Sequence, residues 1–167
     1  TALIPGGPGL GAWGVRGLRP FGRRLVFYFR SWSVKTWAGK VLLAIFAFPV
    51  VYFIFGMIAA PFVARSYEYA VEGLRLPEPG TIITVQFIRS MLFLMVTIPV
   101  IINWTTNRKK LVISLTLSFF VMVFAYDIYL AIAMPMQLVL VHGLEILADS
   151  FVYSWILVRL FCPEKPI

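Results

Sequence analysis

The sequence predicts an all-α membrane protein with four transmembrane helices and both termini on the cytoplasmic side. Of its 167 residues, 60% are hydrophobic and only 13% are charged. Soluble domains carry roughly 45–50% apolar and about 25% charged residues, so this excess of apolar side chains is expected to face lipid. The second observation is the order of the chain, in which long uncharged runs alternate with short basic or turn-forming segments.

Residues 1–40 form a Pro/Gly- and Arg-rich cytoplasmic arm. Its basic residues are interleaved with aromatic residues, a composition typical of a helix that lies in the membrane interface. Two interpretations stay open: an interfacial helix around residues 20–36, or a long anchor before the first span. The residues expected to contact lipid headgroups or a partner, here and in the loop 105–110, are Arg16, Arg19, Arg23, Arg24, Arg30, Arg108, Lys109 and Lys110.

Four apolar runs follow the arm, and residues 162–167 form a short cytoplasmic tail. A membrane-spanning helix needs about 20 predominantly apolar residues, which each run supplies. The predicted spans are residues 41–64, 82–104, 111–134 and 138–161. In the third span, Ser114 and Ser118 have the spacing of a small-residue contact between membrane helices.

The distribution of basic residues predicts the orientation. With the N-terminus inside, twelve Lys or Arg residues fall on the cytoplasmic side and two on the outside. This bias follows the positive-inside rule. It also explains the net charge of +8 without nucleic acid, which is not an expected partner; the expected partners are membrane lipids and other membrane subunits.

Ionisable residues inside the spans are the most informative feature. A charged group at the centre of a membrane helix costs about 2.5–3.5 kcal/mol on insertion scales, so it usually has a partner or a task. At ~1.5 Å per residue, three such residues are expected at one level, about 10 Å below the outer surface. They are Arg89, Asp127 and Glu145, each from a different span.

Two polar stripes are expected to face each other inside the bundle. On the fourth span, a narrow stripe holds His142, Glu145, Asp149 and Tyr153; on the second span, a stripe holds Gln86, Arg89, Ser90, Phe93 and Thr97. The expected ion pair joins Arg89 to Glu145, which leaves the carboxylates in excess. Three interpretations stay open: a structural clasp between helices, a site for a proton, ion or small ligand, and ligation of a metal or cofactor.

No catalytic motif is present, and the chain is not expected to be an enzyme. It contains no nucleophile elbow, zinc-protease motif, phosphate-binding loop or dinucleotide fingerprint. One histidine without a neighbouring thiolate is weak evidence for a zinc or iron site, so no metal or cofactor is expected. Axial ligation of a haem or pigment by His142 is a lesser alternative. The single cysteine, Cys162, excludes an internal disulfide.

The region from about Val41 to Phe161 resembles a loose group of small bacterial four-helix integral membrane proteins. The resemblance rests on the Arg-Ser-Tyr-Glu stretch at 65–68, the Gln86-x-x-Arg89 pair, the basic loop after Trp104 and the His142-x-x-Glu145-x-x-x-Asp149 pattern. It implies a bacterial plasma membrane and a polar site near the outer leaflet, and it carries no activity.

Two hypotheses of function follow. The first is a non-enzymatic accessory subunit of a larger membrane complex, attached through its basic arm. The second is a small transporter or a ligand- or proton-sensing membrane protein that uses the pocket formed by Arg89, Asp127, His142, Glu145 and Asp149.

Overall fold

The described part of the protein is all helical. The computed structural model describes residue 28 and residues 32–69, 78–104, 107–130 and 136–162, without the side chains of 64–69 and 126–130. Four helices run through these residues: α2 (Val34–Tyr69), α3 (Pro79–Asn103), α4 (Arg108–Leu130) and α5 (Met136–Phe161). The expected interfacial helix at 20–36 lies mostly outside the described residues.

All four helices begin earlier than their apolar runs, and polar caps set the starts of α2 and α4. The Ser33 hydroxyl accepts a hydrogen bond from the Thr36 backbone N–H at 3.2 Å, and the Asn107 side chain accepts one from the Lys109 N–H at 2.8 Å. Such side chains satisfy the free N–H groups of a first helical turn. At α3 a proline occupies the first helical position, where its missing N–H costs nothing.

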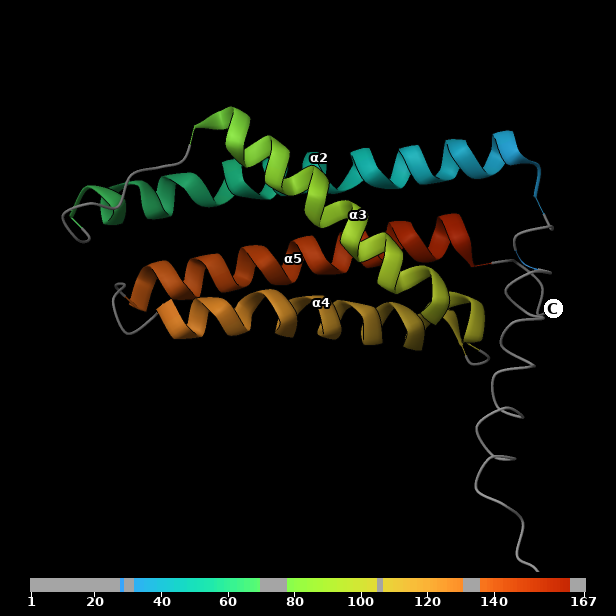
Figure 1. The fold of residues 1–167 in the computed structure, drawn as a ribbon. Helices are drawn as coiled ribbons and strands as arrows, with labels where there is room; N and C mark the ends of the chain where they lie inside the picture. The colour runs from blue at the N-terminus through green and yellow to red at the C-terminus, as the bar shows by residue number, and fades with distance from the viewer. Residues whose placement is uncertain (1–27, 29–31, 70–77, 105–106, 131–135, 163–167) are drawn as a thin grey trace, which may run out of the picture.

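Helix α5 is the centre of the bundle. It packs along α2 on one side and α4 on the other, whereas α3 packs mainly against α2. Figure 1 shows α3 crossing the other helices obliquely, so that it meets the start of α4 and diverges from the end of α4. The buried core that joins the four helices contains Ala44, Phe48, Phe93, Leu94, Ile101, Leu111, Leu115, Phe119, Tyr153, Leu157, Val158 and Phe161.

Large apolar side chains cover the outside of all four helices. Examples with more than half of their surface exposed are Met57 on α2, Met95 on α3, Val121 on α4 and Leu144 on α5. A soluble monomer rarely exposes apolar patches of this extent. Helices α2 and α3 are also long and apolar enough, by length and composition, to cross a membrane.

The close contact between α4 and α5 occurs at a glycine that sequence reasoning did not single out. A Cβ atom added at Gly143 would lie 2.6 Å from the Phe124 ring, so the ring occupies the space that any other residue would need. The predicted contact through Ser114 and Ser118 stays a prediction, because the packing between the described helices does not use Ser118. Ser118 is exposed, and its hydroxyl donates to the Ser114 carbonyl of its own helix at 2.8 Å.

Three side chains hold the last carbonyls of α5. The Tyr28 hydroxyl donates to the Phe161 carbonyl, the Lys40 ammonium to Leu160 at 2.7 Å, and the Arg108 guanidinium to Cys162 at 3.2 Å. The final carbonyls of a helix lack partners within the helix and attract positive charge. Burial, with a smaller contribution from Cys162, raises the pKa of Tyr28, so the hydroxyl keeps its proton for this bond.

Aromatic rings surround this C-terminal end of the bundle. The Lys40 ammonium lies 3.1 Å from the centre of the Trp32 ring, and the Trp37 ring packs 5.7 Å from Phe161. Tyr28 contacts both tryptophans edge-on, at 5.3 Å and 5.5 Å. The last residues of the N-terminal arm are therefore anchored to the end of α5.

Replacing Lys40 with methionine is expected to lower the free energy of unfolding by about 1.5–3 kcal/mol, the usual contribution of a hydrogen bond to a charged group. The substitution removes both the bond to Leu160 and the cation–π contact with Trp32. Denaturant unfolding in mixed micelles measures the change. The control is Lys35→Met on the exposed face of the same helix, and an equal loss in both variants would contradict the assigned role of Lys40.

Candidate functional site

A cavity of about 530 Å³ lies among the four helices, in the half of the bundle away from the end of α5. This volume falls within the range of roughly 300–1,000 Å³ that small-molecule sites occupy. Its walls are Phe48, Tyr52, Val85, Gln86, Ile88, Arg89, Leu92, Phe93, Phe119, Met122, Val123, His142, Ile146, Asp149 and Ser150. The cavity thus has a largely apolar lining and a few polar side chains, the pattern expected of a ligand pocket.

Apart from Tyr52 on α2, the polar side chains of the cavity come from α3 and α5. Gln86 and Arg89 are one turn apart on α3, and His142, Asp149 and Ser150 lie on α5. The sequence predicted that stripes on these two helices face each other, and four of the predicted site residues do line the same cavity. Ser150 was not predicted, because it directly follows Asp149 and so lies outside the narrow stripe on α5.

Two buried oxygen atoms on the cavity wall lack partners among the described residues. Asp149 is 6% exposed and its Oδ1 accepts no hydrogen bond; Gln86 is 4% exposed and its Oε1 accepts none. A buried polar atom without a partner costs about 1–3 kcal/mol. Both residues belong to the cavity wall, so a small rotation of either side chain would offer its oxygen to a hydrogen-bond donor inside the cavity.

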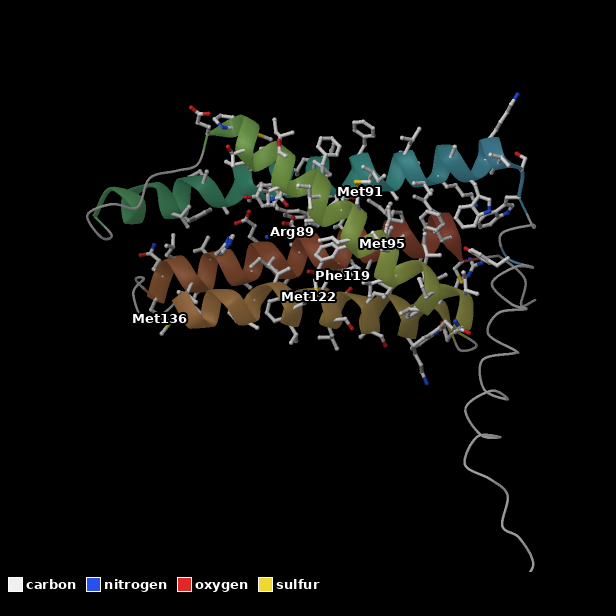
Figure 2. All side chains as sticks on the ribbon, viewed as in Figure 1. Arg89, Met91, Met95, Phe119, Met122 and Met136 are labelled. Carbon is white, nitrogen blue, oxygen red and sulfur yellow. The ribbon has the colours of Figure 1, made fainter. Side chains whose placement is uncertain are left out.

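The predicted ion pair between Arg89 and Glu145 is not formed between these two described residues. Glu145 instead pairs with His142, whose Nδ1 lies 3.0 Å from the Glu145 Oε2. The two residues are one helical turn apart on α5, where side chains at i and i+3 meet. Arg89 is half-buried and directs no hydrogen bond or ion pair to a described residue; Figure 2 places it between α3 and α5.

A glycine on α2 gives Glu145 its space. A Cβ atom added at Gly56 would lie 3.3 Å from the Glu145 Oε1, so the carboxylate fits between His142 and the backbone of α2. Glu145 does not line the cavity, although the sequence placed it in the pocket. Glu145 lies on the predicted face of α5, but its side chain extends toward α2 instead of into the cavity.

An aromatic layer closes the cavity toward the C-terminal end of α5. Its members are Phe48, Phe93, Phe119 and Tyr153. Phe93 stacks on Phe119 with ring centres 4.5 Å apart, and Phe48 meets Tyr153 edge-on at 4.9 Å. Tyr153 is fully buried and its hydroxyl lies 3.3 Å from the Ser90 hydroxyl. Tyr153, predicted as a site residue, therefore supports the floor of the cavity and does not line it.

Several predicted residues fall outside what the structure describes. The side chain of Asp127 is among them, as are Arg16, Arg19, Arg23, Arg24 and Arg30. Of the other predicted headgroup contacts, Lys109 and Lys110 are exposed, whereas Arg108 is half-buried and binds the Cys162 carbonyl. In the part of the chain that the structure describes, no group of three or more His, Cys, Asp or Glu side chains is placed to hold a metal ion.

Comparisons with family models, with curated proteins and with solved structures find no match for the chain.

Proposed function

We propose that this chain is a four-span integral membrane protein that binds a small polar ligand in the cavity, as a transporter or a ligand sensor. The observation that carries the proposal is a cavity inside an apolar bundle whose wall holds Arg89, Asp149 and Gln86, the last two each with a buried oxygen that lacks a partner among the described residues. Membrane proteins keep ionisable groups at such depth mainly where they pair or act on a substrate.

A structural clasp explains the cavity less well. A clasp stabilises a bundle only when its polar groups satisfy each other, because an unpaired buried charge is strongly destabilising. His142 and Glu145 meet this condition at 3.0 Å. Arg89 and Asp149 line the same cavity without an ion pair between them. This arrangement is expected of groups that bind a ligand.

The proposed topology has both termini in the cytoplasm, in what we take to be a bacterial plasma membrane. Apolar side chains cover the outer faces of α4 and α5 as they do those of α2 and α3, which supports four spans. The exposed Lys109 and Lys110 begin α4 at the end of the bundle where α5 terminates. This placement agrees with a cytoplasmic side that is rich in basic residues.

The accessory-subunit hypothesis stays a prediction. Its main basis is the basic arm, most of which lies outside the described residues. The arm's last residues also hold α5, through Tyr28 and Trp32. A deletion that tests the arm as an attachment should therefore end at residue 26, before Tyr28, so that the bundle itself remains intact.

Native mass spectrometry of the full chain, extracted from its own membrane in mild detergent, tests the proposal. We expect one bound small mass per chain, and we expect Arg89→Met and Asp149→Asn to lower its occupancy at least tenfold. The control is Ser118→Ala, which changes an exposed hydroxyl that is not part of the cavity wall. A protein that carries no small mass but retains other protein chains would overturn the proposal in favour of the accessory subunit.

A further inference from the structure

The polar groups of the cavity constrain the chemistry of its ligand, if the proposed function holds. Asp149 and Gln86 offer oxygen atoms, which accept hydrogen bonds and attract positive charge. Arg89 offers only donors and a permanent positive charge, and it lies on the wall of the same cavity. A ligand that satisfies both kinds of group must carry N–H donors and an anionic group on one molecule.

Charge balance favours the same kind of ligand. Among the described side chains, the charge of Arg89 in the cavity is opposed by that of Asp149, and His142 pairs with Glu145 at 3.0 Å. A ligand with a net charge would leave one buried charge uncompensated, at a cost of several kcal/mol. A zwitterion leaves none.

The cavity opens toward the hydrocarbon layer between α3 and α4. Ile88 and Leu92 on α3 and Met122 on α4 line the cavity, and each is also more than half exposed on the outside of the bundle. In Figure 2, Met122 and Phe119 lie on α4 across from Arg89, on the side where α3 diverges from α4. Side chains that belong to both surfaces form the rim of an opening.

We infer that the cavity binds a zwitterionic group with a primary ammonium and an anion, and that this group enters from the membrane between α3 and α4. The ammonium donates to Asp149 and Gln86, and the guanidinium of Arg89 binds the anion, here a phosphate. The apolar rim accommodates the remainder of an amphiphile. Two sources share this chemistry: the ethanolamine phosphate headgroup of a phospholipid, and free phosphoethanolamine from water.

The test compares two headgroups that differ in their N–H donors alone. The full chain, reconstituted in detergent, is titrated with phosphatidylethanolamine or with phosphatidylcholine and followed by native mass spectrometry. Both lipids are zwitterions with a phosphate, but the quaternary ammonium of choline has no N–H. We expect one phosphatidylethanolamine to bind at least tenfold more tightly than phosphatidylcholine, and Asp149→Asn to reduce that ratio.

Two variants test the phosphate contact and the ammonium contact separately. Arg89→Met is expected to weaken both lipids alike, because it removes the phosphate contact, whereas Gln86→Met lowers the preference for ethanolamine even if Asp149→Asn does not fold. Ser118→Ala on the exposed face of α4 leaves both affinities unchanged. A third arm titrates soluble phosphoethanolamine, with phosphocholine as its match.

The outcomes distinguish the ammonium contact, the route of entry and the proposed function. Equal affinity for the two lipids, unchanged by Asp149→Asn, overturns the ammonium assignment. Tight binding of phosphoethanolamine without lipid binding keeps the zwitterion and overturns entry from the membrane. If none of these ligands binds, but the native protein still carries a small mass that Arg89→Met removes, then the inference fails while the proposed function stands.

Discussion

Replacing Asp149 with leucine is expected to stabilise the empty bundle and to abolish ligand binding at the same time. The Asp149 side chain is buried, and its Oδ1 has no partner among the described residues. A buried polar atom without a partner costs about 1–3 kcal/mol, and the substitution removes this cost. Arg89, which opposes the charge of Asp149, is only half-buried, so it loses less than a fully buried charge would. The adjoining cavity of about 530 Å³ also gives the larger leucine room without strain.

The measurement is the free energy of unfolding in mixed micelles, made on ligand-free protein, together with the bound small mass by native mass spectrometry. Glu145→Leu is the matched control on the same helix, and it is expected to act in the opposite direction because it leaves His142 without its partner at 3.0 Å. A loss of stability in Asp149→Leu with ligand binding intact would mean that Asp149 serves the fold and not a ligand.

Replacing Gly143 with alanine is expected to lower the free energy of unfolding by about 1–3 kcal/mol, the usual cost of overpacking a well-packed site. The added Cβ would lie 2.6 Å from the Phe124 ring, so α4 and α5 must move apart. A glycine-to-alanine change inside a helix otherwise gains about 0.5–1 kcal/mol. The steric cost must therefore exceed that gain before any loss is observed.

Two further variants identify the cause of the loss. Gly39→Ala is the control, because nothing lies within 4 Å of the added Cβ and α2 is exposed there; we expect it to stabilise the protein slightly. Phe124→Leu combined with Gly143→Ala is expected to recover most of the loss, since the smaller side chain vacates the contested space. Equal effects of alanine at Gly39 and Gly143 would contradict the close packing of α4 and α5.

The cavity lies between an aromatic floor and a rim formed by two helices. Its floor is the aromatic layer of Phe48, Phe93, Phe119 and Tyr153, and its rim is made by α3 and α4. Helix α3 packs mainly against α2, and α4 packs mainly against α5. Because α2 also packs along α5 and Phe93 on α3 stacks on Phe119 on α4, the floor of the cavity is part of the core that joins the four helices.

The helical content of the protein and its polar stripes are determined by local sequence. Long apolar runs mark the four helices, and their period places Gln86, Ser90, Phe93 and Thr97 on the buried face of α3. The caps Ser33 and Asn107 are local signals too, and their use would have placed the helix starts correctly. These features depend on residues within a few turns of each other, which is why sequence alone predicts them.

The choice of partners is not local, and only the tertiary structure decided it. Depth along the helices predicted that Arg89 pairs with Glu145, but Glu145 turns to His142 because Gly56 on α2 leaves room beside it. Likewise, nothing near residue 160 in the sequence indicates that Tyr28, Lys40 and Arg108 hold the end of α5. The cavity exists because α3 crosses the bundle obliquely and diverges from α4. Crossing angles depend on how side chains of different helices fit together, and hydropathy and periodicity describe each helix only by itself.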